Sequence, residues 1–213
     1  MIRLKSEIPF AQGHYRACYR HPGKELRCLK LLLAGSMPDE LRRKAAWIKK
    51  LRAVRSFSQN EMDHVEFSKL YERIGSKLLD HLSKVFGIVT TDLGEALETE
   101  LICDSNGSIS GTGHKIRLQC PAWDPVDSAI NELSKFCRTH RIFLKDPGVD
   151  NIAFQRSETG DLRAKIVDGF SSLPSTVFFK PLRFTHPALA EKKMAKFKSR
   201  MHHFYIKDGV SCE

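Results

Sequence analysis

The sequence predicts an α+β fold of two lobes, and three observations lead to this prediction. Residues 7–33 alternate short apolar runs with turns, which is typical of an antiparallel β meander. Residues 38–74 then carry apolar side chains at helical spacing, and a strand pair follows at about 86–103. Two predicted helices frame the rest of the chain. We therefore expect a single domain of 213 residues, with an N-terminal lobe at about 1–103 and a reduced, mainly helical C-terminal lobe at about 104–213.

The N-terminal lobe is expected to open with three strands. Residues 7–20 form two of them, joined by a short turn at residues 12–14. The hairpin turn at residues 21–24 follows, because Pro and Gly are the strongest breakers of regular structure. Residues 25–33 form the third strand, an apolar run that only Lys30 interrupts.

Two helices and two strands complete this lobe. Pro38 stands at a natural first position of a helix. Helical spacing continues through Leu41, Ala45, Ile48 and Leu51, and a second helix is predicted at 60–74 with Met62, Leu70 and Ile74 on its apolar side. The strands are expected at 86–91 and 96–103, and a turn at 104–107 ends the pair.

The C-terminal lobe begins after a polar, glycine-bearing stretch at 104–115. Asp124-Pro125 then predicts a helix start, with Ile130, Leu133, Phe136 and Cys137 on one face. The expected order after it is an apolar run at 142–144, strands at 152–155 and 162–167, and a helix at 187–205 that caps the lobe.

Composition excludes several classes. No apolar run reaches eighteen residues, so no transmembrane helix is expected, and the first residues lack the apolar region of a secretory signal. The six cysteines form no C-x-x-C pair, which argues against a zinc site. We expect reduced thiols and a cytoplasmic location.

The net charge of +10 is concentrated in two clusters. Either could bind an anion such as nucleic acid, an anionic membrane or a phosphorylated ligand, and a solvated helix face is the alternative. The clusters consist of Arg42, Arg43, Lys44, Lys49, Lys50, Arg52 and Arg55, and of Lys192, Lys193, Lys196, Lys198 and Arg200.

One segment carries a chemical pattern. Asp146 is followed five positions later by Asn151, which enters an apolar strand, and this is the D-x-x-x-x-N spacing of a kinase catalytic loop. Asp168-Gly169 directly follows another strand, as the metal-binding Asp does in D-F-G. Upstream, Cys28-Leu29-Lys30 is similar to the V-A-I-K strand, whose Lys holds nucleotide phosphates. Each motif alone is common by chance, but their order along the chain is that of a protein kinase.

Phosphoryl transfer explains these residue types. The reaction needs the triphosphate held, its charge neutralised and the acceptor aligned. Asp168 and the amide oxygen of Asn151 are the hard oxygen ligands that Mg²⁺ prefers, and Lys30 would meet the phosphates of ATP. Asp146 would accept or align the proton of the acceptor hydroxyl.

Beyond the kinase motifs, residues from about 8 to 200 resemble the family of PhoP regulatory network proteins known as YrbL, a group similar to protein kinases but shorter. The resemblance is carried by Gly13 with residues 16–22, by 28–30, 65–67, 87–94 and 101–104 with Asn106-Gly107, and by the Asp146 loop with Asp168-Gly169.

The resemblance implies a role for each matching position. Lys30 would bind phosphate and pair with Glu66 on a helix, with Glu61 and Glu72 as other candidates on that helix. The backbone of Glu100, Leu101 and Ile102 would meet adenine. Asp146 would be the catalytic aspartate, and Asn151 and Asp168 the metal ligands.

The chain also departs from the kinase pattern. Only Gly13 remains of the glycine-rich loop, and Arg16 would replace backbone contacts to phosphate with a cationic one. Gly148 stands two places after Asp146, where a Lys is usual. Only about forty-five residues follow Asp168, and no A-P-E appears among them. These differences argue against a peptide substrate.

The expected function is therefore that of an ATP- and Mg²⁺-dependent phosphotransferase of protein-kinase-like fold, acting on an unknown, non-peptide acceptor. One alternative is a pseudokinase-type nucleotide-binding regulatory module that acts through a protein partner. The other is a basic nucleic-acid-binding protein, although the aromatic-basic interleaving that stacks bases is missing.

Overall fold

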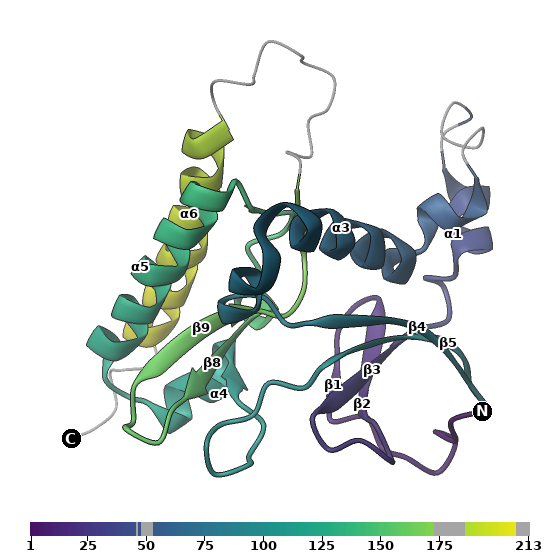
Figure 1. Ribbon diagram of the computed structural model, residues 1–213, viewed down its shortest axis with the longest axis horizontal. Helices are drawn as coiled ribbons and strands as arrows, with labels where there is room; N and C mark the ends of the chain where they lie inside the picture. The colour runs from purple at the N-terminus through teal and green to yellow at the C-terminus, as the bar shows by residue number, and fades with distance from the viewer. Residues whose placement is uncertain (46, 48–52, 173–185, 208–213) are drawn as a thin grey trace. The chain divides into compact units, whose positions relative to one another are not determined.

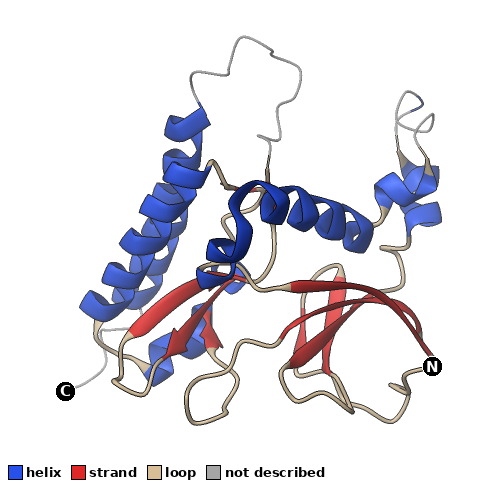
Figure 2. Ribbon diagram, viewed as in Figure 1, coloured by secondary structure: helices blue, strands red, loops and turns tan. Residues whose placement is uncertain are grey.

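A computed structural model describes residues 1–45, 47, 53–172 and 186–207 (Figure 1). The chain forms two compact units. The first comprises Met1–Ser68 and Lys84–Leu101, and the second comprises Lys69–Ser83 and Ile102–Glu213. The α+β class is confirmed, because each unit combines strands with helices (Figure 2).

The first unit is built on a five-stranded antiparallel sheet of order β1-β2-β3-β5-β4. The strands are β1 (Ala11–Gln12), β2 (Arg16–Arg20), β3 (Arg27–Leu32), β4 (Val85–Thr91) and β5 (Gly94–Glu100). The predicted meander and the second strand pair are thus both present, with their ends shifted by a few residues. Because β5 lies next to β3, the middle of the sheet is formed by strands distant in sequence.

Strand alternation decides which face of the sheet Lys30 occupies. Successive side chains of a strand point to opposite faces. Leu29 and Leu31 belong to a core cluster with Leu4 and Ala96. Lys30 therefore lies on the other face, in register with Cys18 of β2 and Leu97 of β5.

Helix α1 (Pro38–Lys44) begins at the predicted proline, with acidic residues in its first turn and basic residues in its last. This arrangement suits the helix dipole. Ile48 and Leu51, the predicted continuation, lie outside the described residues. A short 3-10 turn, η1 (Val54–Phe57), leads into α3.

Helix α3 (Gln59–Ile74) matches the predicted helix, but its buried face differs from the prediction. Phe67 and Leu70 are buried, together with Asn60 and Asp63. Met62 and Ile74, predicted on the apolar side, are only half-buried. The polar residues are tolerated inside because they are bonded to partners, as described below.

Besides the end of α3, the described part of the second unit contains the helices α4 (Gly113–Gln119), α5 (Trp123–His140) and α6 (His186–Lys207). α5 was predicted, and it buries Ile130, Leu133 and Cys137, while Phe136 is half-buried. α6 buries a stripe made of Ala190, Met194, Phe197, Met201 and Tyr205. The two helices lie side by side (Figure 1), and Lys198 of α6 pairs with Asp127 of α5 at 2.7 Å.

Helix α4 was missed by the sequence prediction, which treated 104–115 as a polar separator. The reason is its close tertiary packing. A Cβ atom on Gly113 would come within 2.8 Å of Cγ2 of Val149, so glycine is required at the helix start for contact and not for flexibility. Ile116 of the same helix is buried.

Short strands complete the second unit. β6 (Gly111–Thr112), β8 (Ile152–Arg156) and β9 (Leu162–Ile166) form an antiparallel sheet of order β6-β8-β9. β7 (Phe143–Leu144) pairs with β10 (Phe170–Ser171). Two further 3-10 turns are η2 (Gly75–Asp80) and η3 (Val149–Asn151).

Candidate functional site

The Asp146 segment and the Asp168 segment are joined within the second unit by the pairing of β7 with β10. Leu144 stands opposite Phe170, and the backbone N–H of Lys145 donates to the Gly169 carbonyl at 2.6 Å. Each candidate aspartate lies at the end of this two-stranded pair. The pairing therefore brings together two motifs that are separated in sequence by the β8–β9 hairpin.

Asn151 ties the two segments to each other. Its Nδ2 donates to the Asp146 carbonyl at 2.9 Å, and its own carbonyl accepts the Val167 N–H at 2.9 Å. With the amide nitrogen directed to Asp146, the amide oxygen is the atom that the side chain offers to a ligand. The structure thus brings Asp146, Asn151 and Asp168 together.

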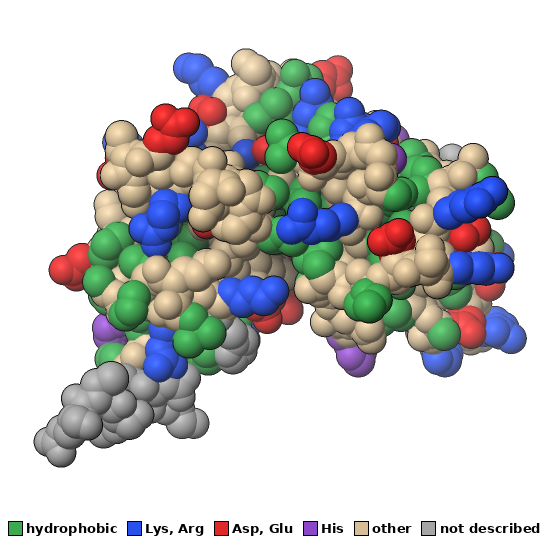
Figure 3. Space-filling model, turned by 90° about the horizontal axis from the view of Figure 1, so that it is seen from below, with side chains coloured by type: hydrophobic (Ala, Val, Ile, Leu, Met, Phe, Trp, Pro, Cys, Tyr) green, Lys and Arg blue, Asp and Glu red, His purple; other side chains and the backbone are tan. Residues whose placement is uncertain are grey.

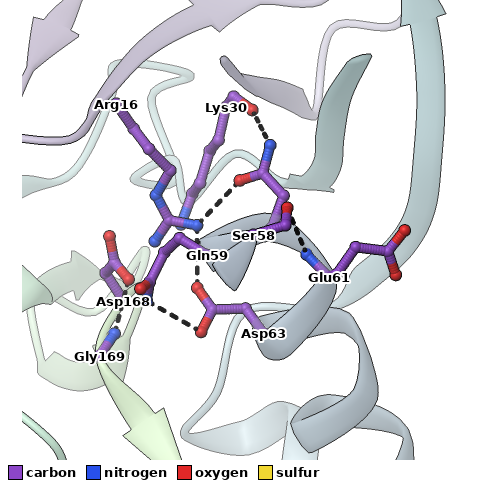
Figure 4. Close-up of polar contacts among 9 residues, drawn as sticks. Arg16, Lys30, Ser58, Gln59, Glu61, Asp63, Asp168 and Gly169 are labelled. Atoms are coloured by element: carbon purple, nitrogen blue, oxygen red, sulfur yellow. Dashed lines mark hydrogen bonds and ion pairs between the residues drawn. The ribbon is translucent and has the colours of Figure 1, made fainter. Parts of the chain in front are cut away.

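Gly169 shapes this corner of the site. Its φ is +68°, and a Cβ atom there would stand 3.0 Å from Nδ2 of Asn151. An L side chain would meet both backbone strain and a collision. Gly169 also donates its N–H to Oδ1 of Asp168 at 2.6 Å, which fixes the carboxylate (Figure 4).

The donor set of this corner fits Mg²⁺. The Asp168 carboxylate and the Asn151 amide oxygen are hard oxygen ligands, and Mg²⁺ usually takes one or two protein carboxylates and keeps several waters. Within the described residues, no group of three or more His, Cys, Asp or Glu side chains is arranged to hold a metal ion. A metal held here would therefore take few protein ligands and complete its shell from phosphate and water.

Lys30 and Arg16 lie on β3 and β2 of the first unit, and both are buried, with exposed fractions of 6% and 5% (Figure 4). Nη1 of Arg16 pairs with Oδ2 of Asp63 on α3 at 2.8 Å and donates to Oδ1 of Asn60 at 3.2 Å. Asn60 in turn donates from Nδ2 to the Lys30 carbonyl at 2.9 Å. Helix α3 is thus tied to the two strands that carry the predicted phosphate-binding cations, through Asp63 to β2 and through Asn60 to β3.

Two thiols share the face of the sheet that carries Lys30. Cys18 and Cys28 lie on the same side of the β2–β3 pair as Lys30. A hydrogen bond to Cys18, together with burial, raises the pKa of the Cys28 thiol well above its ordinary value. The protonated thiol adds no negative charge that would repel a phosphate from the lysine.

The other predicted site residues lie in the first unit or at the start of the second. Glu66 is half-buried on α3, one turn after Asp63; of its alternatives, Glu61 is half-buried and Glu72 is exposed. Gly13 closes the β1–β2 turn by donating its N–H to the Arg16 carbonyl at 2.9 Å.

The backbone N–H groups of Glu100 and Leu101 donate to the Lys84 and Leu26 carbonyls, at 2.7 and 3.0 Å. The Ile102 carbonyl accepts the N–H of Ser110 at 3.0 Å. An adenine contact at this segment would therefore have to use its other backbone groups.

Sequence reasoning missed Asn60, Asp63 and the contacts of Arg200. Asn60 and Asp63 could have been noticed because they share a helical stripe with Phe67 and Leu70, where a polar residue needs a partner. No comparable signal marks Arg200, whose Nη1 donates to the Pro147 carbonyl at 2.8 Å and stands 3.6 Å from Oδ1 of Asp146. Its contacts depend on how α6 packs.

Comparisons with known proteins found one matching family model and two curated relatives. The model of one family, described as PhoP regulatory network protein YrbL, matches residues 2–203. Two curated relatives, from Escherichia coli (strain K12) and Shigella flexneri, each described as uncharacterized protein YrbL, are 25% identical over 175 residues, covering 79% of this chain and 72% of the relative.

One similar solved structure is described as the crystal structure of the BubR1 kinase domain. It matches with a TM-score of 0.53 and 9% identity over 94% of this chain, which spans 61% of that kinase domain. At this identity the likeness concerns the fold alone, and it confirms the predicted kinase-like architecture.

Proposed function

Because this chain belongs to the family of PhoP regulatory network proteins known as YrbL and has a protein-kinase-like fold, we propose that it is an ATP-dependent phosphotransferase whose acceptor is not a peptide. The observation that carries the proposal is the joining of Asp146, Asn151 and Asp168 by the β7–β10 pair and by the Asn151 hydrogen bonds. The acceptor is proposed to be other than a peptide because the sequence contains no A-P-E segment.

The residues divide the work according to their chemistry. Asp168 and Asn151 would hold Mg²⁺, which would neutralise phosphate charge when bound. Asp146 is 73% exposed and would accept the proton of the acceptor hydroxyl or align it. Lys30 would offer its ammonium group to the phosphates, and the bond from Asn60 to the Lys30 carbonyl would hold the lysine's strand against α3.

Titration calorimetry with ATP and Mg²⁺, followed by a turnover assay over acceptor pools, tests the proposal. We expect Asp168→Ala to weaken Mg²⁺-dependent ATP affinity at least about tenfold. Asp146→Ala should keep ATP binding and lose about 10²–10⁴-fold in transfer rate, the usual contribution of a general base.

Glu158→Ala is the matched control, because it removes an exposed carboxylate of the second unit from the turn between β8 and β9. If Asp168→Ala binds ATP as tightly as the Glu158→Ala protein, the metal-site assignment is wrong. If the wild-type protein binds no ATP in the presence of Mg²⁺, the whole proposal fails.

A second candidate function is a nucleotide-binding regulatory module that acts through a protein partner. It is favoured by Arg16, whose guanidinium pairs with Asp63 and Asn60 and so has less capacity to replace the missing glycine-loop contacts. ATP binding without turnover in any acceptor pool would decide for this candidate.

Other features bear on location and partners. Five cysteines are free thiols, which supports a cytoplasmic location as part of the proposal; they are Cys18, Cys28, Cys103, Cys120 and Cys137.

Among the described residues, no helix is long and apolar enough to cross a membrane. On the face shown in Figure 3, Lys and Arg side chains are dispersed, which does not favour a nucleic-acid surface there.

A further inference from the structure

Helix α6 holds the loop that carries Asp146 at three points. Nζ of Lys193 donates to the Lys145 carbonyl at 3.3 Å, and Nη1 of Arg200 donates to the Pro147 carbonyl at 2.8 Å. The same Nη1 stands 3.6 Å from Oδ1 of Asp146. Lys193 and Arg200 lie about two helical turns apart, so they contact the loop on both sides of Asp146.

The geometry of Arg200 indicates orientation more than stability. Its side chain is 44% exposed and that of Asp146 is 73% exposed, so the ion pair by itself contributes little to stability. The charge-assisted bond to the Pro147 carbonyl is the shorter contact. A planar guanidinium that contacts a carbonyl and the preceding carboxylate restricts how that carboxylate can turn.

The backbone of Arg200 is well anchored for this task. The buried stripe of α6 includes Phe197 and Met201, one on each side of Arg200 in sequence. Lys198 also fixes the helix to α5, through Asp127 at 2.7 Å and Asn131 at 2.9 Å. A rigid helix is a better support for a positioning residue than a loop.

The loop is also supported from a second element. Oγ1 of Thr112, at the start of α4, donates to Oδ1 of Asp150 at 3.1 Å. Gly113 packs against Val149, where a Cβ atom would not fit. α4 thus holds the Asn151 end of the loop, and α6 holds the Asp146 end.

We propose that Arg200 is a positioning residue that holds the carboxylate of Asp146 in its working orientation. The inference rests on the proposed function for its catalytic meaning, since Asp146 acts there on the acceptor hydroxyl. The holding of the loop itself is a property of the second unit and can be measured without any turnover.

The test compares Arg200→Met with Arg200→Lys and with Lys192→Met, which removes an exposed cation from the same helix. Hydrogen exchange of a peptide spanning residues 142–151 reports loop order. We expect exchange in Arg200→Met to be at least about tenfold faster than in the wild type, with Lys192→Met unchanged.

In the turnover assay, Arg200→Met should lower kcat at least about tenfold and change ATP affinity less than twofold, which is the pattern of a group that acts on the chemical step. Arg200→Lys should recover less than half of the lost kcat, because an ammonium lacks the planar fork of a guanidinium. In a further variant, Arg200→Ala, added guanidinium should restore activity.

Two results would overturn the inference. One is exchange in Arg200→Met equal to that in Lys192→Met. The other, if the wild-type protein is active, is a kcat of Arg200→Met equal to that of Lys192→Met. If the wild type binds ATP but transfers no phosphate, the proposed function fails, while the exchange comparison still decides whether Arg200 holds the loop.

Discussion

The buried pair of Arg16 and Asp63 offers the sharpest test of how the first unit is held together. The two side chains are 5% and 2% exposed, and their charged atoms stand 2.8 Å apart. Asp63→Asn keeps the shape of the side chain and removes its charge. Arg16 then remains buried next to Asn60 and a neutral residue, and it has lost the carboxylate of Asp63.

The expected loss follows from desolvation. Removing one member of a buried ion pair costs about 3–5 kcal/mol, because the remaining charge is left uncompensated. For a chain of this length, that loss corresponds to a decrease in Tm of roughly 6–20 °C. The cost should appear in the first unit, since β2 and α3 are the elements that the pair joins.

Replacing both partners should behave differently. Arg16→Met with Asp63→Leu removes both charges and should be neutral, or stabilising by about 1–4 kcal/mol, relative to the wild type. The double-mutant cycle should therefore show a coupling well above the about 0.5 kcal/mol scatter expected for independent sites.

The assay is urea unfolding followed by circular dichroism, with hydrogen exchange of β2 and β3 peptides to locate the loss in the first unit. Glu72→Gln, an exposed carboxylate on the same helix, is the control and should stay within about 0.5 kcal/mol of the wild type. A loss below about 1 kcal/mol in Asp63→Asn, or single-variant losses that simply add, would refute the reasoning.

Three further predictions concern backbone strain and titration. Gly169→Ala should lose about 1–3 kcal/mol of stability in urea unfolding because of backbone strain, and calorimetry should also show a loss of Mg²⁺-dependent ATP affinity. Gly160→Ala is the control: its φ is +89° and no atom lies within 4 Å of an added Cβ, so it should show the loss from strain alone. Burial raises the pKa of the Cys137 thiol to about 12, so the unfolded state loses the thiol proton at a lower pH than the folded state does. The contribution of Cys137 to stability should be fully present below about pH 9 and decrease by about 1.4 kcal/mol per pH unit above it. An equally steep decrease in the Cys137→Ala variant would contradict this prediction. The Leu4 N–H donates to Oδ1 of Asp92 at 2.6 Å and lowers the pKa of that carboxyl. The contribution of Asp92 to stability is therefore present above its ordinary pKa and lost as the pH falls through the lowered value. Asp92→Asn should flatten the acid limb of a plot of unfolding free energy against pH.

Local patterns predicted most of the fold. Strand alternation around Lys30, the proline at the start of α1 and the helical spacing of α5 are all properties of short segments. Their physical causes act between near neighbours, so a sequence reader can recognise them. α4 was missed because Gly113 at its start is required for close contact with η3, and no local pattern records such a contact.

The candidate site was predictable to the extent that its residues stand in fixed spacing. Asp146 and Asn151 share one loop, and Asp168-Gly169 ends one strand, so their residue types alone indicated the chemistry. Glu66 was chosen as the helix partner of Lys30 by the same reasoning, and its role stays a prediction. The pairing of Asp63 with Arg16 was not foreseen, because several carboxylates on α3 are equivalent in sequence.

The sequence by itself thus determined the order of most elements, the strand that carries Lys30, and the three polar residues of the Asp146–Asp168 corner. Only the tertiary structure decided which charges meet. Arg16 pairs with Asp63 because α3 packs against β2, and Arg200 contacts Asp146 and the Pro147 carbonyl because α6 packs against the loop that carries them. In both cases the two partners are far apart in the sequence. A charged side chain selects its partner by burial and distance, and both are set only when the apolar stripes of α3 and α6 have packed.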